Sequence, residues 1–332
     1  MKLFITTPES LTETPETWDQ DLLVEIACLE AEGEKVALID NACLRFGVED
    51  LIGYIKEVTN TVCATNEEAE VILWRPKDVF REEYLNRITS KEMWKADHAQ
   101  NFTSKPPYPA WHHLPLQSYF ENPPLDYNAD TLMAKTRFHF KWNVGDHLKY
   151  TPQRMCRMLT YTKLRHPYDF ASFHDDVTEN KEWTQKFLLE MDNQDLTGTF
   201  KWGAKARIES VSHSDLESLR ERQCTYLNYG VINIVDLGSK DGVMFNQLEA
   251  AIRGSKKDGV TPIVRVELNP CMSLDALIKV AKLLVAEEVN RRPVIKPYTP
   301  TSLDYWSYVE LIGAAELIDS GDLDKISDLV LS

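Results

Sequence analysis

The chain has 332 residues, a formal net charge of −15 and a pI of about 5.0. This acidic balance argues against sequence-independent nucleic-acid binding and against docking on an anionic membrane, since both need a basic surface. No apolar run approaches the ~20 residues of a membrane-spanning helix, and the polar opening MKLFITTPES does not resemble a signal peptide. We therefore expect a cytoplasmic globular protein without a nucleic-acid or membrane partner.

Six cysteines are scattered along the chain, and no two of them lie within four residues of each other: Cys28, Cys43, Cys63, Cys156, Cys224 and Cys271. This spacing excludes a CxxC-type zinc or redox motif. Free thiols of a cytoplasmic protein are the natural interpretation.

The first 80 residues alternate between short apolar strands and amphipathic helices. Strands are predicted at residues 2–6, 35–39 and 70–74, and helices at residues 19–32 and 48–58. Such alternation implies a parallel sheet. No GxGxxG or Walker loop is present, so no sequence motif indicates nucleotide binding by this half of the chain. Asp40, at the end of the second strand, is either a ribose ligand or a turn or cap residue.

A charged connection, predicted to be helical, spans residues 80–100 and is followed by a proline-rich segment at 105–124. Its six prolines predict neither helix nor central strand. We expect a linker between two domains, pinned by Trp111, Tyr119 and Phe120.

The second half repeats the alternation of strand and helix. Strands are predicted at residues 137–142, 168–174, 200–206, 226–235, 262–268 and 293–296, and helices at residues 152–164, 181–191, 214–222, 247–253 and 274–288. About six β-α units in a row favour a partial or complete parallel barrel.

Polar residues that follow these strands are the candidate site, because chemistry in α/β folds sits at the carboxyl ends of strands. The strand at 168–174 runs into two adjacent carboxylates, and a helix starts near Glu179. The ligand-pocket candidates are Asp175, Asp176, Arg207, Glu209, Asp236, Glu267, Lys296 and Tyr298, with Asn269 beside them. The alternative is that either aspartate caps the helix and that the others form surface ion pairs. No residue is assigned as catalytic.

Several phrases resemble radical SAM proteins that carry an N-terminal cobalamin-binding-type domain. The most specific is PPYPAWHHLPLQSYF at 106–120, and the others are LLVEIACLEAEGEKVALID, FASFHDDVTEN, AKARIESVS and KPYTPTSLDYW. The resemblance implies an α/β fold with a small parallel Rossmann-like domain, followed by a partial (β/α)6 TIM-like barrel of the radical-SAM type. The expected parts are a truncated cobalamin-binding-like domain at 1–104, a linker at 105–125, the barrel at 126–310 and a helical tail at 311–332.

The chain departs from this family where its cofactors bind. The family's CxxxCxxC motif holds a four-iron cluster after the first barrel strand, but residues 136–155 contain no cysteine. His139 and His147 flank the place and do not make a cluster site. The D-x-H-x-x-G of the cobalamin loop is also missing between Asp40 and Pro106. We therefore expect no iron–sulfur cluster, no cobalamin and no other metal, while binding of S-adenosylmethionine (SAM) stays open.

Two functions follow from the degenerate resemblance. The first is a non-catalytic pseudoenzyme that acts as a binding or partner subunit, with a second copy or an active radical SAM homologue as its protein partner. Trp18, Trp94, Trp111 and Trp306 are the expected aromatic anchors of that interface. The alternative is a repurposed enzyme that uses the carboxylates, arginine and lysine of the barrel mouth on a small-molecule or SAM/nucleoside-like ligand without iron.

Overall fold

The computed structural model describes residues 2–6, 20–41, 48–62, 70–74, 107–121, 134, 136–144, 148–233, 243–268, 273–295 and 308–321. The chain divides into two compact units. Unit 1 comprises Met1–Pro124 and Lys141–Tyr150, and unit 2 comprises Leu125–Phe140 and Thr151–Ser332. Among the described helices, none is both long and apolar enough to cross a membrane.

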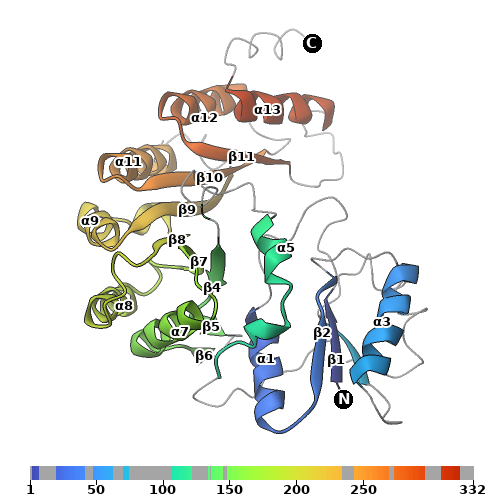
Figure 1. The fold of residues 1–332 in the computed structure, drawn as a ribbon. Helices are drawn as coiled ribbons and strands as arrows, with labels where there is room; N and C mark the ends of the chain where they lie inside the picture. The colour runs from blue at the N-terminus through green and yellow to red at the C-terminus, as the bar shows by residue number, and fades with distance from the viewer. Residues whose placement is uncertain are drawn as a thin grey trace. The chain divides into compact units, whose positions relative to one another are not determined.

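Unit 1 contains a three-stranded parallel sheet in the order β2-β1-β3. Its elements are β1 (Lys2–Thr6), α1 (Gln20–Ala31), β2 (Val36–Ile39), α3 (Val48–Val62) and β3 (Glu70–Trp74). Strands β2 and β3 lie on opposite sides of β1, so the two crossovers run in opposite directions along the sheet. Because both are right-handed, α1 and α3 lie on opposite faces of the sheet, as Figure 1 shows. The three strands and both helices confirm the prediction, although α3 runs four residues beyond its predicted end.

The core of unit 1 joins the sheet, α1 and the proline-rich segment through Phe4, Leu22, Ile26, Ile72 and Ala110. Asp40 lies buried at its edge and accepts hydrogen bonds from Thr6 Oγ1 at 2.6 Å and from Tyr119 Oη at 2.5 Å. These contacts favour the structural alternative for Asp40 over the ribose ligand.

The proline-rich segment contains a 3₁₀ turn, η1 (Trp111–His113), and a short helix, α5 (Leu116–Glu121). The expectation that no helix forms at 105–124 is therefore wrong. Helix α5 fits between Pro115 and Pro123, because a proline just ahead of a helix removes no hydrogen bond from it. Trp111 and Tyr119 are buried, as expected of pinning residues. The Phe120 side chain and the predicted helix at 80–100 lie outside the described residues.

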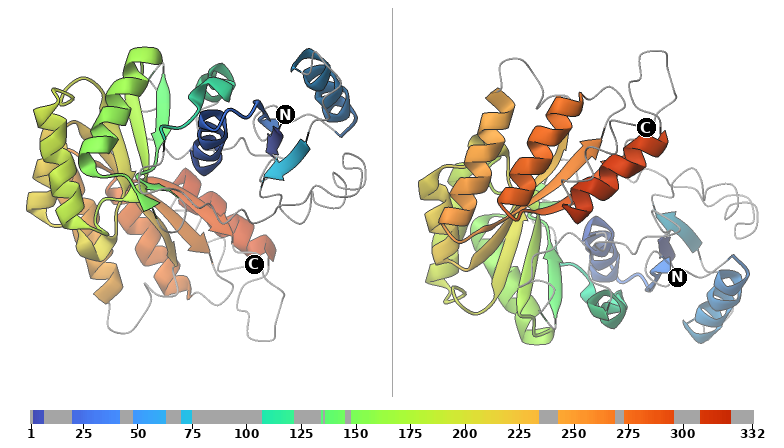
Figure 2. Two further views of the ribbon diagram at one scale, coloured as in Figure 1. Left: turned by 90° about the horizontal axis from the view of Figure 1, so that it is seen from below. Right: turned by 90° about the horizontal axis from the view of Figure 1, so that it is seen from above.

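Unit 2 contains a six-stranded parallel sheet whose strands follow chain order from β4 to β11. The strands are β4 (Arg137–Phe140), β7 (Phe170–Asp176), β8 (Lys201–Lys205), β9 (Cys224–Asn233), β10 (Thr261–Leu268) and β11 (Asn290–Ile295). The helices are α7 (Pro152–Arg165), α8 (Lys181–Asn193), α9 (His213–Glu221), α11 (Val243–Lys257), α12 (Leu274–Ala286) and α13 (Tyr308–Ser320). Because every crossover steps to the next strand with the same hand, these helices cover one face of the sheet (Figures 1 and 2).

Aromatic side chains fill the layer between this sheet and its helices. Phe173 of β7 packs edge-on against Trp202 of β8 at 5.5 Å between ring centroids, and also against Phe187 of α8. The Trp202 indole N–H donates to the Arg222 carbonyl at 2.6 Å, so the ring is buried with its polar atom satisfied. This layer is the apolar side of the sheet.

Several boundaries in unit 2 differ from prediction. Strand β7 continues through Asp175 and Asp176, which were expected to follow it. The strand predicted at 137–142 stops at Phe140. An antiparallel hairpin follows it, formed by β5 (Asn143–Val144) and β6 (Leu148–Lys149), and belongs to unit 1. Helix α11 is twice the predicted length, and α13 begins at Tyr308, ahead of the predicted tail.

Candidate functional site

The face of the six-stranded sheet opposite its helices carries many polar side chains beside a small apolar cluster of Phe170, Tyr226 and Ile263. In β4, Arg137 and His139 alternate with Phe138 and Phe140, and Phe140 contacts Phe173, which packs on α8. The register pairs His139 with Ser172. Following this register across the sheet places one set of side chains on a common face, which we call the polar face: Arg137, His139, Phe170, Ser172, His174, Asp176, Lys201, Lys205, Tyr226, Asn228, Ile263, Arg265 and Glu267.

Two histidines meet on the last two strands at one edge of this sheet, β4 and β7. His139 Nδ1 lies 3.1 Å from His174 Nε2, within hydrogen-bond distance. His139 is only 5% exposed. Burial, aided by the nearby Arg137 guanidinium, lowers the pKa of His139 from 6.5 to about 3. The imidazole is therefore neutral at physiological pH and offers one donor and one acceptor.

A second polar pair lies beside the histidines. Tyr226 Oη donates to Ser172 Oγ at 3.0 Å, and the Tyr226 ring stacks on Phe170 with centroids 5.9 Å apart. The ring lies across Gly203 of the intervening strand, where a Cβ atom would overlap it. Glycine at this position therefore leaves space for the Tyr226 ring to cross β8, so that its hydroxyl reaches Ser172 on β7.

The described charges of the polar face are biased toward cations. Its described residues include four cationic side chains, Arg137, Lys201, Lys205 and Arg265, and two anionic ones, Asp176 and Glu267. This bias contrasts with the net charge of −15 for the whole chain. A local excess of cations on an acidic protein concentrates small anions at that place.

Asp175 and Asp176 have different surroundings, because successive strand residues face opposite sides of a sheet. Asp175 is buried at 8% exposure, whereas Asp176 forms an ion pair with Arg207 at 3.0 Å. Asp176 Oδ1 also accepts from the Thr178 N–H at 2.7 Å and from the Thr178 hydroxyl. The helix-capping alternative is wrong for both aspartates, since Asn180 caps α8 by accepting from its third residue.

The remaining predicted pocket residues are only partly brought together. Arg207 and Glu209 line a hollow of about 240 Å³ at the carboxyl ends of β8 and β9, with Tyr229 and Met244. Glu267 lies on the polar face. Asp236, Lys296 and Tyr298, and Asn269 beside them, lie outside the described residues.

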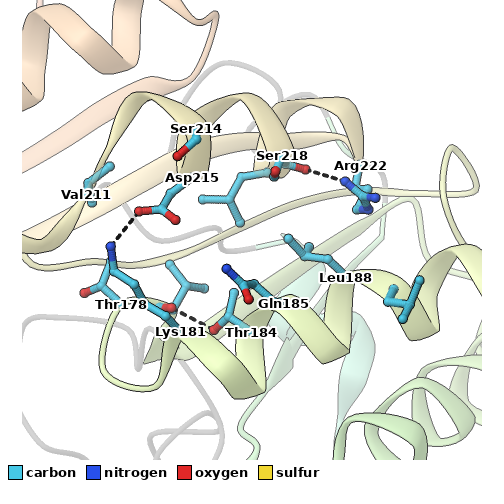
Figure 3. A pocket seen from close by; sticks show the side chains of 13 residues that line it. Thr178, Lys181, Thr184, Gln185, Leu188, Val211, Ser214, Asp215, Ser218 and Arg222 are labelled. Atoms are coloured by element: carbon cyan, nitrogen blue, oxygen red, sulfur yellow. Dashed lines mark hydrogen bonds and ion pairs between the residues drawn. The ribbon is translucent and has the colours of Figure 1, made fainter.

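Another hollow, of about 190 Å³, lies between helices α8 and α9 (Figure 3). The charged side chains at its edge form ion pairs with acidic residues. Lys181 Nζ lies 2.8 Å from Asp215, and Arg222 lies 2.7 Å from Asp192. These pairs tie the two helices together, so we interpret this hollow as part of the helix layer.

His174, Ser172 and Tyr226 are not among the site residues predicted from the sequence, and His139 was considered there only as a metal ligand. A usable signal was present in the alternation of polar and aromatic residues in RFHF at 137–140 and in FASFH at 170–174. A strand buried on both faces would have been uniformly apolar.

No protein-family model matches the sequence, and no curated protein is similar to it in sequence. In structure the chain is similar to TsrM, a radical S-adenosylmethionine methyltransferase from Kitasatospora setae, solved with cobalamin and a [4Fe-4S] cluster. The TM-score is 0.53 at 10% identity over 89% of this chain and 72% of that chain. The same enzyme with tryptophan and the SAM analogue aza-SAM gives 0.54 at the same identity and coverage. At this identity the likeness establishes a similar fold and nothing further.

Proposed function

We propose that this chain is a radical-SAM-like binding protein that holds a small anionic ligand on its polar face and carries no iron–sulfur cluster. In this proposal unit 1 is a Rossmann-like domain and the six-stranded sheet is a partial (β/α)6 barrel. The similarity to the methyltransferase and the chain-order sheet support the fold part of the proposal.

The described thiols do not fit a cluster, which needs several thiolates held close together. The three described cysteines lie on three different elements: Cys28 on α1, Cys156 on α7 and Cys224 on β9. Burial raises the pKa of all three thiols, that of Cys156 to about 12. Protonated thiols in separate places are poor ligands for iron.

The stretch between β4 and α7, where the resemblance places the cluster cysteines, is instead tied into unit 1. The Gln20 amide donates to the Lys141 carbonyl at 2.7 Å and accepts from the Lys141 N–H at 2.8 Å. Tyr150 Oη donates to the Pro107 carbonyl at 2.7 Å. These contacts support a structural role for this stretch in place of cofactor binding. Cobalamin does not fit either, because the D-x-H-x-x-G ligand motif is missing from the sequence.

The polar face is the observation that carries the binding proposal. Its histidine pair, its serine–tyrosine pair and its excess of cations supply hydrogen-bond donors and positive charge for a carboxylate or phosphate. Binding is favoured over catalysis, because a general acid or base works best with a pKa near the operating pH. The pKa of His139, at about 3, is far from that range, and Asp176 is already paired with Arg207.

Thermal melting of the full-length protein tests the proposal. Inorganic phosphate, citrate and adenosine diphosphate are each compared with sodium chloride at equal ionic strength. We expect at least one of them to raise the melting temperature of the natural protein. The rise should shrink in Arg265→Gln and in the more exposed Lys205→Gln.

The matched control is Arg253→Gln, which removes an exposed arginine of α11 that pairs with Glu249 and Glu287 on the helix layer. This variant should respond to the anion like the natural protein. The proposal is wrong if no anion acts beyond chloride, or if Arg253→Gln loses the response as fully as Arg265→Gln.

A further inference from the structure

Three metal-ligating side chains converge in unit 1, outside the polar face. His112 Nε2 lies 3.1 Å and His113 Nε2 lies 2.9 Å from the same oxygen, Glu30 Oε1. One ligand atom from each of the three residues lies within 4.8 Å of the other two. Glu30 comes from α1 and the histidines come from η1, about 80 residues later in the chain.

The backbone holds these side chains in place. Helix α1 presents Leu23 and Glu30 two turns apart on one side, and the Ala110 N–H donates to the Leu23 carbonyl at 3.0 Å. Trp111, directly before the histidines, is 3% exposed. The 3₁₀ turn closes with a bond from the His113 N–H to the Ala110 carbonyl at 3.2 Å. The turn that carries both imidazoles is thus docked on α1 by contacts that do not involve them.

We propose that Glu30, His112 and His113 form a binding site for a divalent transition-metal ion of the zinc class. Two imidazoles and one carboxylate are a ligand set that Zn²⁺ accepts, with water completing a tetrahedral shell. Imidazole nitrogen favours such ions over Mg²⁺ and Ca²⁺, which prefer oxygen ligands.

The distances between the ligand atoms are close to those that a bound ion would require. With Zn–N and Zn–O bonds of ~2.0–2.1 Å, neighbouring ligand atoms of a tetrahedral shell lie roughly 3.3 Å apart. The nitrogen–oxygen separations of 2.9 and 3.1 Å need to open by only a few tenths of an ångström. The His112 side chain is 61% exposed and can swing to adjust, whereas His113 at 16% is held more firmly. These two separations can therefore be adjusted by side-chain rotation, and the third, between the two imidazoles, lies within 4.8 Å.

A metal at this position would crosslink α1 to the proline-rich segment. Those two elements already share the core that contains Ile26 and Ala110. The ion would bind the folded arrangement and not the unfolded chain, so it would stabilise unit 1. This site and its role are independent of the anion binding proposed for the polar face.

Full-length protein, stripped with a chelator and then freed of it, provides the test. We expect calorimetry to detect one equivalent of Zn²⁺, Co²⁺ to give the visible bands of a nitrogen- and oxygen-bound tetrahedral ion, and Mg²⁺ to give no binding. Glu30→Gln and the exposed His112→Gln should each weaken Zn²⁺ binding at least about tenfold. Both variants keep side-chain size and should melt like the natural protein without metal, so a folding defect is separable from lost ligation.

Two controls complete the design. His213→Gln removes an exposed histidine that pairs with a single carboxylate, Asp258, at 2.6 Å, and it should bind Zn²⁺ like the natural protein. Cys28→Ser removes the thiol on the same helix as Glu30 and should also leave binding intact. Unchanged affinity in Glu30→Gln and His112→Gln would overturn the site, as would a sulfur-to-cobalt charge-transfer band or loss of binding in Cys28→Ser or His213→Gln.

Discussion

Gly203 and Tyr226 are coupled residues of the polar face. A methyl group at Gly203 would overlap the Tyr226 ring, which is 3% exposed and hydrogen-bonded to Ser172. We predict that Gly203→Ala lowers the free energy of unfolding by about 1–3 kcal/mol, the usual cost of overpacking a core. Urea unfolding of the two proteins measures this cost.

A double-mutant cycle identifies the tyrosine ring as the cause. In a Tyr226→Ala background the space beside Gly203 is open, so Gly203→Ala should cost much less there than in the natural protein. An equal cost in both backgrounds would mean that Gly203 is needed for its backbone alone.

His139 makes the stability of the protein depend on pH. The folded protein keeps His139 neutral, with a pKa of about 3, whereas the unfolded chain takes up the proton near 6.5. The unfolded state therefore binds more protons between these values, and stability falls as the pH drops below 6.5. Between pH 7.5 and 5.0 this single group should cost about 2 kcal/mol.

The comparison with His139→Gln isolates that contribution, because all other titrating groups are present in both proteins. We expect the variant to lose about 2 kcal/mol less than the natural protein between pH 7.5 and 5.0 in urea unfolding. Equal losses of stability in the two proteins would show that His139 is not shielded from water as described.

At the level of elements, the hairpin of β5 and β6 depends on a buried glutamine. Gln20 is 2% exposed and makes both of its hydrogen bonds to the backbone of Lys141. Gln20→Ala would strand a backbone donor and acceptor, and we predict a loss of about 1–3 kcal/mol in the free energy of unfolding. Gln185→Ala on the exposed side of α8 is the control and should change stability by less than about 0.5 kcal/mol. Equal effects of the two substitutions would contradict a stabilising role for the hydrogen bonds between Gln20 and Lys141.

Most elements were predictable because their patterns are local. Strands of four to eight apolar residues and helices with a 3.6-residue repeat mark β1, β2, β10 and α12 within a few residues. Helix α5 and the hairpin were missed, because both are short and are stabilised by contacts with distant residues such as Gln20 and Asp40. Local sequence carries no signal for such tertiary contacts.

The candidate site was predictable only in part, because it depends on which strands become neighbours. Asp176 and Arg207 were predicted to follow two different strands, and the structure joins them in an ion pair. The contact between His139 and His174 could not be predicted, since it requires the register between β4 and β7. The pairing of Glu30 with two histidines about 80 residues away was equally invisible.

At the scale of the whole molecule, association with a protein partner remains a prediction. One of its four expected anchors, Trp111, is buried within unit 1 and is unavailable to a partner. The other three, Trp18, Trp94 and Trp306, lie outside the described residues. Light scattering measures the outcome for self-association, with a mass of twice the 38.2 kDa chain expected for a dimer. The mass of a single chain would leave only a different protein as the partner, to be sought by co-purification.

Anaerobic reconstitution with iron and sulfide tests whether the protein can hold an iron–sulfur cluster. We predict that the desalted protein keeps no stoichiometric acid-labile sulfide and shows no broad absorbance near 400 nm, because its three described cysteines lie on separate elements and no two of its six cysteines lie within four residues of each other in the sequence. Sulfide is the decisive quantity, since the Glu30–His112–His113 site could retain iron alone. About four iron and four sulfide per chain, with a brown colour, would contradict the account.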